Sequence, residues 1–174
     1  MFVLDYSRDK IKAAMKKYIR NHKDKNFKEN IIYLYNDLKH SKILMVVDVL
    51  EKLGIKLHFL EIPVDKEILN YIKENNLTLN NLPNLKILPS FNLAEDEKNQ
   101  ETWDKLKLIE KNLNILKEFL KQKETTNEVF IIFSYLPFYQ FKNFLHFFDK
   151  ELYLLFLQKI LMIIDYTLLT KIKN

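Results

Sequence analysis

Apolar side chains along this chain follow two kinds of pattern, short continuous runs and helical spacing. The runs are rich in β-branched and aromatic residues and end at Asn, Asp, Thr or Pro, as is typical of buried strands. They are IIYLY (31–35), IKLHFLEI (55–62), LKILPSF (85–91) and EVFIIFSY (128–135). Between them, apolar residues recur every three or four positions. The pattern therefore predicts four strands separated by amphipathic helices.

Local signals give approximate ends for these helices. Ser7 is suited to cap a first helix and Asp65 to cap a short one over 66–75. Gly54 is suited to end the second helix, because glycine enters the left-handed C-cap conformation without strain. The remaining expectations are a surface loop NLAEDEKNQ (92–100), a helix over about 101–123, and a helix over about 140–172 with a break near 149.

The alternation of strand and helix predicts the fold class. We expect an α/β domain in three layers, a mostly parallel four-stranded sheet with helices on both faces. A length of 174 residues without an internal repeat or a long linker fits a single domain, 1–174. It divides into a basic amphipathic helix (1–30), an alternating α/β core (31–135) and apolar C-terminal helices (136–174). Rossmann-like and thioredoxin-like strand orders both remain open.

The composition excludes several kinds of chemistry. The chain has no Cys, so it holds no disulfide, no thiolate metal site and no cysteine nucleophile. It has one Gly, so neither a P-loop nor a G-x-G-x-x-G turn can be built. The four His residues are too far apart in sequence for a zinc motif. No metal and no cofactor are implied.

Three motifs between Tyr33 and Phe91 resemble the thioredoxin-like superfamily. YLY leads into a helix through NDLKHSK, EKLGIKLHFLEI is similar to the Leu-Gly turn into the second strand, and ILPSF looks like the strand that carries a cis-proline. The similarity is to glutaredoxins and to the N-terminal domain of glutathione transferases. His40 and Ser41 occupy the place of the glutaredoxin nucleophile, so the resemblance implies no thiol–disulfide exchange. A serine-type transferase would have its activating hydroxyl near Ser41.

Asp37, His40 and Ser41 form the one local group of acid, base and hydroxyl. They follow the strand 31–35, and ligands bind beyond the carboxyl ends of strands in open α/β sheets. Neighbours in sequence rarely have the geometry of a catalytic triad, whose members converge from separate segments. The alternative is that Asp37 or Ser41 forms the turn and caps the helix.

The N-terminal segment carries the net charge. Residues 1–30 hold nine basic and four acidic side chains, a difference of +5, which equals the formal charge of the whole chain. Such a face can contact phosphates or can simply be solvated. The candidate nucleic-acid contacts are Lys12, Lys16, Lys17, Arg20 and Lys23.

Aromatic residues are concentrated after residue 130, and they spread around the predicted helix instead of forming one stripe. Apolar surface of this kind marks a partner interface or a membrane contact. The candidate interface residues are Phe144, Phe148, Phe156 and Leu161.

The sequence favours a non-catalytic interaction subunit over an enzyme. Its expected partner is another protein or a second copy, with the basic helix available for RNA, DNA or an acidic protein. The alternative is a small glutathione- or nucleotide-dependent transferase with its site at the end of the first predicted strand. Residues 152–169 favour a buried helix over a membrane span, and the N-terminus lacks the features of a secretory signal. We therefore expect an intracellular protein of the cytoplasm or an organelle matrix.

Overall fold

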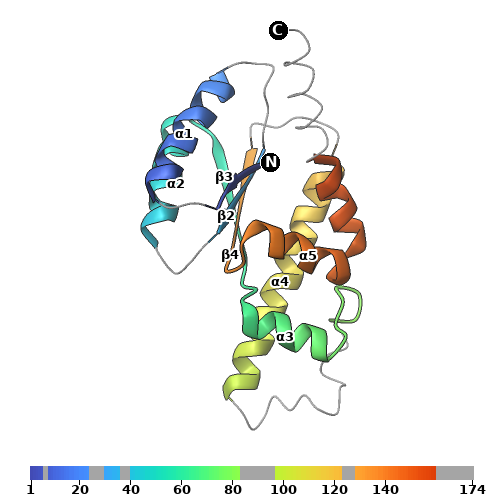
Figure 1. The fold of residues 1–174 in the computed structure, drawn as a ribbon. Helices are drawn as coiled ribbons and strands as arrows, with labels where there is room; N and C mark the ends of the chain where they lie inside the picture. The colour runs from blue at the N-terminus through green and yellow to red at the C-terminus, as the bar shows by residue number, and fades with distance from the viewer. Residues whose placement is uncertain (6–7, 24–29, 36–39, 83–96, 123–127, 160–174) are drawn as a thin grey trace.

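The computed structural model describes residues 1–5, 8–23, 30–35, 40–82, 97–122 and 128–159 (Figure 1). The strands are β1 (Phe2–Leu4), β2 (Ile31–Tyr35), β3 (Lys56–Ile62) and β4 (Glu128–Ser134). The helices are α1 (Arg8–Lys23), α2 (His40–Lys52), α3 (Lys66–Glu74), α4 (Glu97–Lys121) and α5 (Phe138–Phe148), and residues 150–159 are helical too.

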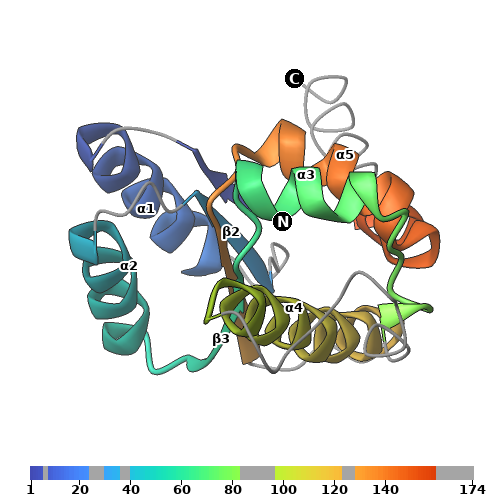
Figure 2. The same ribbon diagram turned by 90° about the horizontal axis from the view of Figure 1, so that it is seen from below.

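The four strands form one parallel sheet in the order β1-β2-β4-β3. Helices α1 and α2 cover one face, and α3, α4 and α5 lie on the other (Figures 1 and 2). This division follows from right-handed crossovers. The connections from β1 to β2 and from β2 to β3 run in the same direction across the sheet, so α1 and α2 lie on the same face. The connection from β3 to β4 runs in the opposite direction, so α3 and α4 lie on the other face. The predicted three-layer α/β fold with a parallel sheet is confirmed.

Three of the four predicted strands are confirmed as β2, β3 and β4. The predicted strand 85–91 lies outside the described residues. The fourth strand of the described sheet is β1, which was not predicted. It has only three residues and pairs only with β2, so it is too short for an apolar run to identify it.

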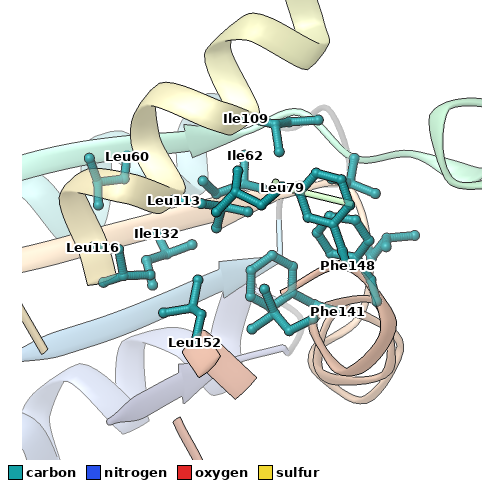
Figure 3. Close-up of a cluster of buried hydrophobic side chains, with 14 of the residues drawn as sticks. Leu60, Ile62, Leu79, Ile109, Leu113, Leu116, Ile132, Phe141, Phe148 and Leu152 are labelled. Atoms are coloured by element: carbon teal, nitrogen blue, oxygen red, sulfur yellow. The ribbon is translucent and has the colours of Figure 1, made fainter. Parts of the chain in front are cut away.

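Two hydrophobic cores fill the spaces between the layers. Beneath α1 and α2, side chains of both helices pack on side chains of β1, β2 and β4. The helices contribute Ile11, Met15, Tyr18, Val46 and Leu50, and the strands contribute Leu4, Ile32, Leu34, Val129 and Ile131. The larger core lies on the other face, where α4, α5 and the following helical segment meet the sheet (Figure 3). Most of the described apolar residues after 130 therefore belong to this second core.

The ends of two helices agree with the prediction. Gly54 has a φ of +68°, the left-handed conformation that ends α2. Asp65 caps α3, since its Oδ1 accepts a hydrogen bond of 2.8 Å from the backbone N–H of Ile68.

Two further boundaries concern α4 and α5. The prediction that 92–100 is a loop is wrong for its last four residues, because α4 begins at Glu97. A polar first turn with a leading Glu favours a helix start through the helix dipole, and it leaves no apolar spacing to detect. The break predicted near Asp149 is confirmed, since Asp149 is extended and ends α5.

Candidate functional site

Helix α5 has a buried aromatic side and an exposed aromatic side. It follows β4 after a turn that ends in Pro137, a residue whose fixed φ suits a helix start. Phe141, Phe144, Leu145 and Phe148 point into the core. The helix is therefore anchored by large rings, which leaves the opposite side for the remaining residues.

Three of the four predicted interface residues do not lie at the surface. Phe144, Phe148 and Phe156 are buried, with at most 2% of their surface exposed. Leu161 lies outside the described residues. The structure thus corrects the assignment for three positions. Because apolar residues occur around nearly the whole circumference of this helix, its sequence does not show which rings face the sheet.

The exposed side of α5 carries a different set of residues, which we call the α5 face. Its members lie within one arc of the helix and are Tyr139, Gln140, Asn143, His146 and Phe147. Tyr139 is 68% exposed and Phe147 is 38% exposed. The helix FYQFKNFLHFF contains no acidic residue. The face therefore combines exposed rings and amides without a carboxylate.

Neighbouring side chains support the rings of the α5 face. The Lys142 ammonium lies 5.5 Å from the ring centroid of Tyr139, and the Lys73 ammonium from α3 lies 5.6 Å from that of Phe147. The ring of Tyr153 meets His146 edge to face, with 4.8 Å between centroids. These contacts reduce the number of rotamers that each exposed ring can adopt.

Charged contacts fix α5 at both ends. At its start, a carboxylate oxygen of Asp5, just after β1, accepts a hydrogen bond of 3.1 Å from the backbone N–H of Phe138. At its end, Asp149 Oδ2 lies 2.7 Å from the Lys117 ammonium of α4. That ammonium is the only partner of Asp149 Oδ2 among the described residues. Helix α5 is therefore held in one position relative to β1 and α4.

A second ion pair supports the same junction. The Lys121 ammonium lies 2.9 Å from Glu151 Oε1, and the Lys117 ammonium lies 3.4 Å from Glu151 Oε2. The hydrogen bond from Lys121 lowers the pKa of the Glu151 carboxyl below its usual value. The same bond raises the pKa of the Lys121 ammonium. Both shifts favour the charged pair at neutral pH.

Helix α1 presents a set of exposed cations, which we call the α1 basic face. Its members are Lys10, Lys12, Lys16, Lys17 and Arg20. Within the described part of the chain, none of the five pairs with a carboxylate. The side chain of Lys23, the fifth predicted nucleic-acid contact, lies outside what the structure describes. Four of the five predicted contacts are thus exposed on one helix.

The predicted group of Asp37, His40 and Ser41 is not brought together by the described residues. Strand β2 ends at Tyr35 and α2 begins at His40. Asp37 lies outside the described residues, and so do the side chains of His40 and Ser41. A catalytic role for these three residues stays a prediction.

At the described part of the carboxyl edge of the sheet, polar groups form hydrogen bonds with other groups of the chain. The first turns of α5 and α3 donate backbone hydrogen bonds to carboxylates of the chain itself, those of Asp5 and Asp65. The buried Tyr33 hydroxyl donates to the carbonyl of Leu136, and burial raises the pKa of this hydroxyl. These two helix starts therefore already hold the anion that such positions favour.

A cluster at the end of β3 was not found from the sequence. The Tyr135 hydroxyl donates a bond of 3.4 Å to Glu61 Oε1, and burial, followed by the charge of Glu61, raises the pKa of Tyr135. Nearby, the Lys105 ammonium of α4 lies 3.7 Å from Asp65 Oδ2. The contacts tie β4 to β3 and α4 to the start of α3. Only the tertiary structure brings these distant residues together.

Among the residues that the structure describes, no group of three or more His, Asp or Glu side chains is arranged to hold a metal ion. The described helices also include none whose length and apolar content would let it cross a bilayer.

Comparison with known proteins gives no relative. No protein-family model matches the chain, and neither the curated proteins nor the solved structures contain a significantly similar one. Function is therefore inferred from this chain's own residues.

Proposed function

We propose that this chain is a non-catalytic protein-interaction subunit that docks on a partner protein through the α5 face. The observation that carries the proposal is the exposure of Tyr139 and Phe147 on a helix that lacks carboxylates and is fixed at both ends.

The composition of the α5 face supports a protein partner. Tyr and Phe are enriched at protein interfaces, whereas Asp and Glu are depleted there. Tyrosine is also among the residues whose truncation most often costs an interface its binding energy. Asn143 lies between the two rings and Gln140 lies beside Tyr139, and both supply donors and acceptors without charge.

The fixed position of α5 supports the proposal because it lowers the conformational entropy that is lost on binding. Ordering flexible side chains and loops at an interface opposes binding, so a surface that is already rigid binds more tightly. Asp5 and Asp149 hold the two ends of α5, and the Lys–ring contacts restrict the rings themselves. No observation on the described residues favours the transferase alternative over this role.

The test compares two variants of the full chain in quantitative affinity capture from a native lysate. The first is Tyr139→Ser/Phe147→Ser, which removes the exposed rings. The matched control is Leu44→Ser/Ile115→Ser, because Leu44 (68% exposed) and Ile115 (39% exposed) have nearly the same exposure on other helices. Loss of one interface hot spot costs about 2 kcal/mol or more, which is a factor of roughly 30 in affinity.

We expect at least one protein whose recovery falls about tenfold or more with the first variant and stays unchanged with the control. Equal losses with both variants, or no protein that depends on the rings, would contradict the proposal. Sedimentation of the purified chain then shows whether that protein is a second copy of this chain.

A further inference from the structure

We infer that the α1 basic face binds the phosphate backbone of a nucleic acid without reading its base sequence. This inference concerns a different helix from the proposed protein-docking surface and stands independently of it. It rests on the arrangement of Lys10, Lys12, Lys16, Lys17 and Arg20.

The cations are placed in rows that can follow a charged strand. Lys12, Lys16 and Arg20 recur every four residues and so form one ridge, while Lys10 and Lys17 lie on a second ridge beside it. From Lys10 to Arg20 the helix rises by about 15 Å. That length equals roughly four nucleotide steps of one strand of a duplex, each rising about 3.4 Å. Asp9 is the only carboxylate that α1 carries.

The α1 basic face lacks the large apolar side chain on which a protein interface is usually centred. Interfaces between proteins are usually centred on a buried aromatic or other large side chain. None of the exposed large apolar residues of the described chain lies on α1. Binding to nucleic acid needs no such centre, because release of counterions from the phosphates supplies most of the affinity.

The way α1 packs also argues against a membrane surface. An amphipathic helix binds lipid by burying its apolar side in the bilayer interface. The apolar side of α1, Ile11, Met15 and Tyr18, is already buried against the sheet, with at most 1% of each residue exposed. Only its charged side is available.

The kind of cation indicates contact with phosphate and not with bases. Specific base contacts are made most often by side chains that bond in pairs, such as Arg to guanine. Four of the five cations are lysines, which act as point charges. We therefore expect binding that varies little with base sequence.

The test is a fluorescence titration of the full chain with three labelled probes of 20 nucleotides or base pairs: single-stranded RNA, duplex RNA and duplex DNA. Each probe is used in two unrelated sequences and at salt concentrations from 50 to 200 mM. If four to five phosphates of a duplex are neutralised, the slope of log affinity against log salt is about −4, and affinity falls roughly 10²–10³-fold over this range. The three probes show which nucleic acid binds best.

The decisive variants change the charge of different helices by the same amount. Lys12→Glu/Lys16→Glu/Arg20→Glu reverses one ridge of α1. Lys66→Glu/Lys111→Glu/Lys150→Glu reverses three exposed lysines of the opposite layer. We expect the α1 variant to weaken binding by about tenfold or more and to reduce the magnitude of the salt slope by roughly 2–3, while the control keeps the slope.

Poly-glutamate and vesicles of anionic phospholipid serve as alternative ligands. Binding of either as tight as that of the nucleic acids would overturn the inference, as would equal losses in the two variants or no binding at 50 mM salt. Circular dichroism checks that the α1 variant is folded. If it is not, Lys12→Gln/Lys16→Gln/Arg20→Gln replaces it, with a smaller loss expected in the same direction.

Discussion

Asp149 makes several contacts where α5 ends. It ends α5, its Oδ1 accepts a hydrogen bond of 3.3 Å from the backbone N–H of Leu152 at the start of the next helical segment, and its Oδ2 pairs with Lys117. Both charged side chains are largely buried, with 7% and 13% of their surface exposed. A buried ion pair of this kind adds little net stability. Loss of one partner nevertheless destabilises the fold strongly, because the other charge stays buried without a countercharge.

We expect Lys117→Met to lower the free energy of unfolding by about 3–5 kcal/mol, since it leaves the Asp149 carboxylate buried without a countercharge. The double variant Lys117→Met/Asp149→Asn should recover part of this loss. Lys121→Met removes a partner from the exposed Glu151 pair and should cost much less, because solvent screens exposed charges. Urea unfolding measures all three. Similar costs for Lys117→Met and Lys121→Met would show that the buried pair does not hold α5.

The Glu151 pair gives a prediction for pH. The pKa of Glu151 is lowered in the folded protein, so its contribution to stability is complete above the usual value of 4.5 and is lost as pH falls through the lowered value. We expect Tm of Glu151→Gln to lie below that of the wild type at pH 7, and the two to converge as pH falls through the lowered pKa of Glu151. Thermal melts from pH 3 to 8 measure this difference.

A neighbouring carboxylate is the control for this titration. Glu118 also approaches Lys121, but at 3.9 Å and with 75% of its side chain exposed. Glu118→Gln should therefore show a smaller change in Tm between pH 3 and 8. A difference between Glu151→Gln and wild type that stays constant over this range would contradict the ion-pair account.

At the scale of elements, the end of α2 depends on one backbone conformation. A Cβ added to Gly54 would meet no atom within 4 Å, so space does not restrict this position. Its φ of +68° does, because a left-handed conformation costs residues with a Cβ about 1–2 kcal/mol. We expect Gly54→Ala to destabilise by about this amount in urea unfolding, and Gly54→Asn by less, since asparagine tolerates this conformation better. A neutral or stabilising Gly54→Ala would contradict this explanation.

The elements that sequence could predict are those with long apolar patterns. The runs 31–35 and 128–135 predicted β2 and β4 because a parallel strand buried on both faces is apolar along most of its length. The run 55–62 predicted β3, a partly buried edge strand, through its Ile, Leu and Phe residues and the Pro63 that follows. Strand β1 was missed because three residues give no pattern, and the start of α4 was missed because its first turn is polar.

The candidate surfaces were predictable to different degrees. The cations of α1 lie opposite Ile11, Met15 and Tyr18, so helical spacing alone places them at the surface. The rings of α5 could not be sorted in this way, because aromatic residues occur on both of its sides. Phe144 is buried and Tyr139 is exposed because of how α5 packs in the larger core, and that packing depends on residues distant in sequence.

At the scale of the whole molecule, the two candidate surfaces lie on opposite sides of the sheet. Helix α1 belongs to one outer layer and α5 to the other (Figure 2). A partner protein on α5 therefore leaves α1 free for a nucleic acid. If both proposals hold, the chain connects a nucleic acid to a protein.

The most direct test of the central claim is photo-crosslinking from defined positions in the full chain. A photoreactive phenylalanine analogue is placed at position 139 or 147, and in separate control proteins at position 44 or 115, where the natural side chains are similarly exposed. We predict that positions 139 and 147 crosslink to the same partner protein and that positions 44 and 115 do not. A partner captured equally from all four positions, or from none, would contradict a docking role for the α5 face.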